Sequence, residues 1–342
     1  MMEGLGAVQQ KISCVFETAV IDEVSKKRDN QSYRVQATSK IKQKAIDNEV
    51  NSAQATEKLD GTCVYFKEFD GQPWLWARFD KKPNKSAERR FKKFQTLKQK
   101  NSTDQTFAWD LDKDFKETPE HWIPASGVEQ EDGRPVPDDI GHTPGWVPVY
   151  PASRQHCWHL SAVDLKAGLA VVLREENEFT LCIECVHLSS LLGRTAELIG
   201  TNINGNPYGI GNKKFPVHLL VVHGTIQVLD PPQLTNEAVK SWFETAGQVE
   251  GIVWHCANGA LFKVHRNHVG LDWPVPKPVL STRPIRIAIE TNDLKSDTCL
   301  LETLAKLDGQ TFASLLDLER VFPSVLTELD HFGMKHCELT SE

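Results

Sequence analysis

The residues best suited to chemistry are a lysine, two glutamates and a second lysine, each within a short motif. Lys58 opens the tetrad Lys-Leu-Asp-Gly at residues 58–61. Glu197 begins Glu-Leu-Ile-Gly, Glu250 begins Glu-Gly-Ile-Val, and Lys263 lies in Leu-Phe-Lys-Val. A single tetrad of this kind occurs by chance in many proteins, but the ordered set is specific. It predicts that Lys58 is a nucleophile and that the other three residues assist it.

The chemistry that suits this set is attack on a nucleotide α-phosphate. A lysine attacks phosphorus only as the free amine, and its ordinary pKa is about 10.4. We therefore expect positive charge from Lys263 and Arg78 to lower the pKa of Lys58 and to stabilise the transition state. Glu250 is the natural ligand for a divalent metal, most simply Mg²⁺. Glu197 is expected to accept a hydrogen bond from a ribose hydroxyl.

A β-hairpin is predicted directly after the lysine tetrad. Residues 62–69 and 73–78 are rich in β-forming side chains and flank the turn Asp70-Gly71. The tetrad would therefore open the first strand, and Arg78 would close the second.

Other elements are expected around the remaining motifs. A helix over 236–246 would begin at Asn236 as its N-cap. A basic helix would begin near Ser86. Further strands are predicted at residues 13–16, 168–174, 179–187, 197–201, 217–223, 251–255, 260–264 and 285–289, and further helices at 188–194, 297–307 and 311–319.

Residues 101–160 differ in composition from the rest of the chain. Prolines and glycines are too frequent there for continuous regular structure. Four tryptophans in or near this segment need burial, so we expect an ordered insertion. The tryptophans are Trp109, Trp122, Trp146 and Trp158.

The amino-acid composition and net charge limit the classes of protein to which this chain can belong. The 342 residues are 40% hydrophobic and 25% charged, which is ordinary for a globular protein. The net charge of -7 argues against indiscriminate coating of nucleic acid, although a local basic groove is compatible with it. No transmembrane run and no secretory leader is recognisable, so we expect an intracellular protein, cytoplasmic or nuclear, that is not secreted.

The eight cysteines are expected to be reduced thiols. Cys182 and Cys185 have the spacing of half a zinc site, but no second pair with this spacing follows. In a strand their side chains would point to opposite faces. Buried or incidental thiols are therefore favoured over a structural zinc.

The ordered motifs resemble the covalent nucleotidyltransferase superfamily of ATP-dependent ligases and capping enzymes. More narrowly, residues 197–209 and 250–256 closely resemble the ATP-dependent 5′-to-3′ RNA ligases of animals, the RNA ligase 1 family. The likeness runs from about residue 10 to residue 290. It implies an α+β fold with an ATP-grasp-like nucleotidyltransferase core of antiparallel sheets flanked by helices. That core would span 1–290, with 101–160 inserted, and 291–342 would form a mostly helical extension.

The resemblance also implies a reaction and a site. Lys58 would take AMP from ATP, the AMP would pass to an RNA 5′-phosphate, and a 3′-hydroxyl would displace it. ATP would be the substrate, with Mg²⁺, replaceable by Mn²⁺, as the cofactor and Glu250 as the metal ligand. The nucleotide-binding set would be Lys58, Asp60, Gly61, Arg78, Glu197, Glu250 and Lys263.

A basic run at residues 81–100 is a candidate RNA contact. It holds nine Lys or Arg residues against one acid, Glu88, and RNA phosphates attract such charge without regard to sequence. A solvated helix face is the alternative. The cations assigned to RNA are Lys81, Lys82, Lys85, Arg89, Arg90, Lys92 and Lys93.

The chain differs from the family pattern at two points, and the sequence leaves several alternative functions open. Many ligases carry Lys-x-Lys in the last motif, whereas this chain has Lys263-Val-His265-Arg266, so His265 or Arg266 must substitute or one contact is absent. Glu197 also lies unusually far from Lys58. A GTP-dependent capping-type guanylyltransferase and a non-catalytic RNA- or nucleotide-binding module remain alternatives, with a DNA ligase less favoured.

Overall fold

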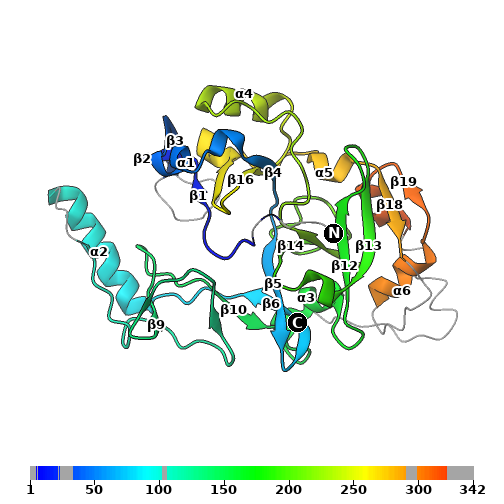
Figure 1. Ribbon diagram of the computed structural model, residues 1–342, viewed down its shortest axis with the longest axis horizontal. Helices are drawn as coiled ribbons and strands as arrows, with labels where there is room; N and C mark the ends of the chain where they lie inside the picture. Colours follow the sequence, from blue (N-terminus) through cyan, green and yellow to red (C-terminus); the bar gives the residue numbers. More distant parts are fainter. Residues whose placement is uncertain are drawn as a thin grey trace.

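The computed structural model describes residues 5, 7–21, 23, 34–101, 106–289 and 299–321. These residues form a mixed α+β structure built mainly from a sheet of four strands and a sheet of eleven (Figure 1). Over the same ranges, no helix combines the length and the apolar character needed to cross a lipid bilayer.

The smaller sheet has the strand order β1-β17-β16-β4. Helix α4 (Asn236–Thr245) lies above it in Figure 1 and shares a core with Ile252, Trp254 and Phe262. Because side chains alternate along a strand, Lys58 and Lys263 face the opposite side. The strands are β1 (Ser13–Cys14), β4 (Gln54–Lys58), β16 (Gly251–His255) and β17 (Leu261–His265).

The larger sheet has the order β19-β18-β13-β12-β15-β14-β5-β6-β10-β7, with β11 paired to β12. Its strands are β5 (Thr62–Phe69), β6 (Gln72–Arg78), β7 (Ile123–Pro124), β10 (Gly145–Pro148), β11 (Val163–Asp164), β12 (Leu169–Glu175), β13 (Leu181–His187), β14 (Thr195–Gly200), β15 (His218–Val222), β18 (Ile285–Ala288) and β19 (Thr311–Phe312). Three pairs are parallel, namely β12 with β15, β13 with β18 and, in the smaller sheet, β1 with β17. The expectation of antiparallel sheets is corrected at these pairs.

At β5 and β14, one face of the larger sheet packs into a hydrophobic core, and the other carries polar side chains. Ala196 and Leu198 of β14 enter one hydrophobic core together with Val64 of β5. Glu197 of β14 and Cys63 of β5 therefore lie on the other face, directly opposite each other in the antiparallel register. This alternation aims both side chains away from the core and toward the smaller sheet.

The remaining elements surround these sheets. Two small sheets are formed by β2 (Phe16–Ile21) with β3 (Arg34–Ile41) and by β8 (Gln130–Glu131) with β9 (Arg134–Pro135). The helices are α1 (Gln43–Asp47), α2 (Lys85–Asn101), α3 (Cys157–Ser161), α5 (Val279–Thr282) and α6 (Cys299–Lys306). The 3-10 helices are η1 (Val50–Ser52), η2 (Arg154–His156), η3 (Leu188–Leu191), η4 (Arg266–Val269) and η6 (Leu315–Asp317).

The predicted hairpin is confirmed, but the tetrad does not open it. Asp70 and Gly71 both have positive φ, which suits the tight turn between β5 and β6. Lys58, however, ends β4 in the smaller sheet, and Leu59 to Gly61 cross to β5 in the larger one. The motif therefore joins the two sheets, a role that local strand propensity does not reveal.

Segment 101–160 contributes to the larger sheet. Strands β7 and β10 extend the sheet beyond β6, and Trp146 of β10 is buried. Trp109, Trp122 and Trp158 are half-buried. Before this segment, α2 extends away from the body of the molecule (Figure 1).

Three local predictions need correction. Thr235 caps α4, since its Oγ1 accepts from the Ala238 N–H at 3.1 Å, while the Asn236 side chain donates to carbonyl oxygens of β3. The helix expected at 188–194 is the shorter η3. The helix expected at 311–319 is replaced at its start by β19, which pairs with the edge of β18. Sheet pairing outweighs helical propensity there.

Candidate active site

A cavity of about 240 Å³ lies between the facing surfaces of the two sheets. The smaller sheet contributes one wall and the larger sheet the other. The N-terminal segment also contributes, although its sequence showed no functional pattern. The lining residues are Val8, Gln10, Lys11, Ile12, Thr56, Glu57, Lys58, Leu59, Cys63, Arg78, Glu197, His223, Gly224, Val253, His255 and Lys263.

Lys58 is paired with Glu250 at the cavity wall. Its Nζ lies 2.5 Å from Glu250 Oε2, and the two side chains are 22% and 3% exposed. Burial alone lowers the pKa of Lys58, but Glu250, with further contributions from Glu197 and Asp60, outweighs it and the net pKa is raised. The expected lowering is therefore wrong for this structure, where Lys58 is an ammonium group paired with a carboxylate.

Asp60 and Gly61 position the lysine and do not line the cavity. The Asp60 carboxylate accepts from Asn204 Nδ2 and Trp273 Nε1, each at 2.8 Å, and its backbone N–H donates to Tyr208 Oη at 2.9 Å. Asn204 Nδ2 also donates to the Gly61 carbonyl at 2.7 Å. These contacts hold the crossing from β4 to β5 in place.

Gly61 has a steric role in the same crossing. A Cβ at this position would lie 2.3 Å from the Leu198 carbonyl oxygen of β14. Only glycine permits that approach, so the last residue of the tetrad fixes how closely the lysine strand joins the larger sheet.

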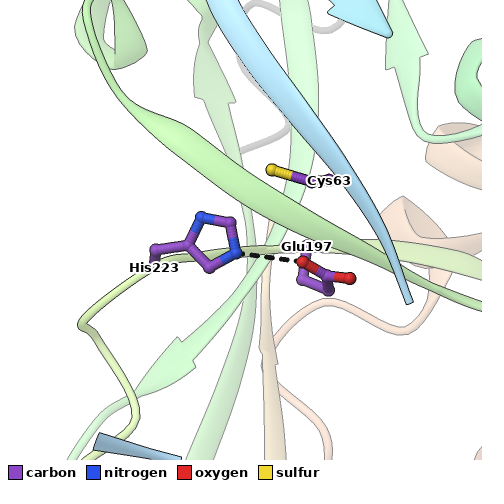
Figure 2. A group of neighbouring side chains, drawn as sticks. All are labelled: Cys63, Glu197 and His223. Carbon is purple, nitrogen blue, oxygen red and sulfur yellow. Dashed lines mark hydrogen bonds and ion pairs between the residues drawn. The ribbon is translucent and has the colours of Figure 1, made fainter. Parts of the chain in front are cut away.

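Glu197 lines the cavity and contacts a residue that the motifs did not identify. Its Oε2 lies 3.0 Å from His223 Nε2, and Cys63 stands beside it on β5 (Figure 2). His223 directly follows β15, the strand next to β14. Cross-strand register brings these three side chains together, which no spacing in the sequence could indicate.

Arg78 lines the cavity but already has several partners. Its Nε donates to Asp80 Oδ1 at 2.7 Å, its Nη1 donates to the Gln9 carbonyl at 2.6 Å, and its guanidinium lies 4.9 Å from the Trp146 ring centroid. Gln9 Oε1 in turn accepts from Trp146 Nε1 at 2.9 Å. The N-terminal segment is thus fastened to the larger sheet through Arg78 and Trp146.

Lys263 lines the cavity from β17, opposite Val253 of β16. Arg266 cannot replace the second lysine of the family motif, because it is 7% exposed and donates to the carbonyls of Phe243, Gly247 and Asp272. His265 shares the face of β17 that carries Lys263. It does not line the cavity.

Glu57, next to Lys58 in the chain, is a further cavity residue that the motif analysis missed. It is buried, and its Oε1 has no hydrogen-bond partner among the described residues. Burial raises its pKa to about 8, with Arg283 opposing and Glu175 and Glu250 adding to the shift. A charged residue next to the tetrad was the available signal, but only the fold shows that it is buried.

Several other candidates lie away from the cavity. The aromatic ring of His218 could stack on a base, but it is buried and stacks on Trp158, with ring centroids 4.9 Å apart. Cys182 and Cys185 occupy alternate faces of β13, as predicted. The seven cations assigned to RNA lie in or just before α2, outside the cavity lining.

Comparison with known proteins identifies the family of the chain. A family model described as RNA ligase 1 matches residues 2–321. The chain is 47% identical over 327 residues to RNA ligase 1 of Danio rerio, covering 93% of this chain and 99% of the relative. It is 49% identical over 327 residues to RNA ligase 1 of Mus musculus and 48% over 324 residues to that of Pongo abelii, with the same coverage. The chain therefore belongs to the RNA ligase 1 family.

Proposed function

We propose that this protein is an ATP-dependent RNA ligase that joins RNA 5′-phosphate and 3′-hydroxyl ends through a lysyl-AMP intermediate. The observation that carries the proposal is Lys58, which lies on a cavity wall in contact with Glu250 and shares the cavity with Arg78, Glu197 and Lys263. Relatives named RNA ligase 1 support the same class of reaction.

In the first step the Lys58 amine attacks the α-phosphate of ATP. A nitrogen–phosphorus bond forms, the bond to the bridging oxygen breaks, and pyrophosphate leaves. Nζ, which is paired with Glu250 Oε2 in this structure, must first lose a proton to solvent. Lys263 and Arg78 would balance the negative charge on the phosphate, and the Glu197 carboxylate would accept a hydrogen bond from a ribose hydroxyl.

The residues present fit a magnesium ion at Glu250. This carboxylate is 3% exposed and contacts Lys58, which lines the cavity, and one carboxylate together with substrate phosphates is a common magnesium environment. Bound there, the ion would neutralise charge on the phosphates. When Glu250 leaves Lys58 for such a ligand, the contribution of the carboxylate to the raised lysine pKa is lost.

The later steps use the same bound nucleotide. An RNA 5′-phosphate oxygen attacks the AMP phosphorus and releases Lys58, which gives an adenylylated RNA end. A 3′-hydroxyl then attacks the RNA phosphate, and AMP leaves. Lys263 and Arg78 would again face the phosphorus at which charge accumulates.

The test is transfer of label from ATP to protein. Protein with Mg²⁺ and ATP labelled at the α-phosphate is denatured, and retained label is counted beside Lys58→Ala and Lys240→Ala. Lys240 lies exposed on α4 and is the matched control. We expect label in the wild type and Lys240→Ala and none in Lys58→Ala. No label in folded wild-type protein would overturn the covalent mechanism, and label from GTP alone would indicate the capping reaction.

A second assay tests the RNA substrate. Labelled protein is mixed with RNA carrying a 5′-phosphate, with RNA carrying a 5′-hydroxyl, and with DNA carrying a 5′-phosphate. We expect AMP to move to the first RNA only and a sealed product to follow when a 3′-hydroxyl is present. Transfer to DNA in preference to RNA would contradict the proposal.

A further inference from the structure

Cys63, Glu197 and His223 form a compact group of metal-ligating side chains in the cavity wall. The Cys63 Sγ, a Glu197 carboxylate oxygen and a His223 ring nitrogen all lie within 4.8 Å of one another. In Figure 2 the His223 ring faces the Glu197 carboxylate, and the Cys63 sulfur lies on the neighbouring strand. All three side chains are half-buried. Among the residues that the structure describes, this is the only such group of three found.

We propose that these three side chains bind one thiophilic divalent cation of the zinc class, with water as the fourth ligand. Thiolate, imidazole and carboxylate are the protein ligands of Zn²⁺, and three of them plus an exchangeable position make an open zinc site. From the usual bond lengths, donor atoms on a tetrahedral zinc lie about 3.3–3.6 Å apart. The three donors here lie within 4.8 Å of one another, so they must approach each other to reach that spacing.

The surrounding backbone holds the donors in place. Cys63 and Glu197 are direct cross-strand partners of β5 and β14. The His223 backbone N–H donates to the Thr195 carbonyl at 3.0 Å, and His223 Nδ1 lies 2.9 Å from Thr195 Oγ1. The Val8 N–H donates to the same hydroxyl oxygen at 2.8 Å. Without a metal, Nε2–H donates to Glu197 Oε2. A metal would bind Nε2 once the ring proton stands on Nδ1, where Thr195 Oγ1 can accept it, and such an outer hydrogen bond is typical of metal-binding histidines.

The donor set also selects the kind of metal. Mg²⁺ prefers oxygen ligands and retains waters, so a site with one sulfur and one nitrogen disfavours it. Burial, with a smaller effect from Glu197, raises the pKa of the Cys63 thiol, so without a metal this cysteine carries its proton. Binding therefore forms a metal–sulfur bond and releases one proton to solvent.

A metal ion bound to these three side chains would block binding of the nucleotide in the cavity. A metal ion with its water on Glu197 would fill the space beside this carboxylate in which the ribose is proposed to lie, because the three donors line the same cavity as Arg78 and Lys58. This consequence rests on the proposed function, whereas metal binding itself does not. The group would thus make nucleotide loading sensitive to zinc-class ions.

Cobalt spectroscopy tests the site without any nucleotide. Reduced protein is titrated with Co²⁺, and thiolate-to-cobalt absorption is recorded for the wild type, Cys63→Ser, His223→Gln and Cys157→Ser. Cys157 is half-buried on α3, outside the cavity lining, and is the matched control. We expect one equivalent in the wild type and in Cys157→Ser, no thiolate band in Cys63→Ser, and affinity at least tenfold lower in His223→Gln. A thiolate band that persists in Cys63→Ser would overturn the proposal.

X-ray absorption of the zinc-loaded wild type needs no variant and covers the case in which one fails to fold. One sulfur with three nitrogen or oxygen neighbours is expected, from Cys63, His223, Glu197 and water. A shell without sulfur, or with two or more sulfurs, would overturn the site.

Competition with adenosine tests the consequence, because adenosine carries the ribose but no chelating phosphates. Saturating Zn²⁺ should weaken adenosine binding at least tenfold in the wild type but not in Cys63→Ser. Unchanged binding to the zinc-loaded wild type would overturn the exclusion. If Co²⁺ binds as expected but ATP labels no protein, the proposed function fails and the metal site stands.

Discussion

At the scale of single residues, the pairing of Lys58 with Glu250 sets a pH dependence. The raised pKa means that the amine fraction of Lys58 rises about tenfold per pH unit at neutral pH. We therefore expect single-turnover transfer of AMP to the protein to accelerate by about that factor per unit between about pH 6 and pH 8. A rate independent of pH over this range would contradict the assignment of an ammonium resting state.

Glu250→Gln should separate the two roles of this carboxylate. Without the charge that raises the lysine pKa, the pH profile should move to lower pH, while the maximal rate falls by about 100-fold because the phosphate and metal contact is lost. Glu244→Gln, on the exposed surface of α4, is the control and should keep the wild-type profile. Quenched labelling across pH measures both quantities.

Glu57 predicts a pH-dependent stability. Its pKa rises on folding from 4.5 to about 8, so the folded state binds more protons than the unfolded state between these values. The stabilising effect of the proton is complete below 4.5 and is lost as pH rises toward 8. Glu57→Gln should therefore be more stable than wild type by about 1–3 kcal/mol at pH 8 and gain little near pH 4.5. Urea unfolding at both pH values checks this, and an equal difference at both would contradict it.

At the scale of elements, α2 has two distinct faces. Ala87 is buried and Phe91 and Phe94 are half-buried, and both phenylalanines contact Phe107. Arg90 is held by the buried Asp114 at 2.8 Å. At helical spacing, the exposed residues Lys85, Arg89 and Lys92 form a separate stripe. The aromatic face anchors the helix and leaves this stripe to solvent.

Charge reversal of that stripe should weaken RNA binding and leave the reaction with ATP unchanged. In the triple variant Lys85→Glu, Arg89→Glu, Lys92→Glu we expect unchanged self-adenylylation and at least tenfold weaker RNA binding. The slope of log affinity against log salt should flatten by about 0.7 per lost phosphate contact. Lys240→Glu on α4 is the control. RNA affinity and salt slope equal to wild type would make the stripe a solvated face only.

At the scale of the whole molecule, the N-terminal segment before β1 contributes Val8, Gln10, Lys11 and Ile12 to the cavity lining without belonging to either sheet. Gln9 Oε1 accepts from the backbone N–H of Ser126 as well as from Trp146 Nε1. Gln9→Ala should leave the buried indole N–H unpaired and cost about 1–3 kcal/mol of unfolding free energy. Gln10→Ala is the control, because Gln10 makes one exposed contact, to the Ser126 carbonyl. Equal unfolding free energies for the two variants would contradict this role.

The motifs by themselves identified the family and five residues that the fold brings together. Lys58, Arg78, Glu197 and Lys263 line one cavity, and Glu250 contacts Lys58. Each of these residues lies in a short strand or at its edge, so its motif could be recognised from the local sequence alone. The β5–β6 hairpin was predictable for the same reason, since its turn and its β-forming residues are contiguous.

Tertiary structure alone decided how the set is arranged. The tetrad joins two sheets, and the register of β5 with β14 places Cys63 beside Glu197. The Arg266 guanidinium donates hydrogen bonds to the backbone carbonyls of Phe243 and Gly247, and Glu57 is buried. Local sequence determines strand propensity and the order of motifs. Register, burial and the balance of charges around Lys58 depend on residues more than a hundred positions away, so they exist only once the chain has folded.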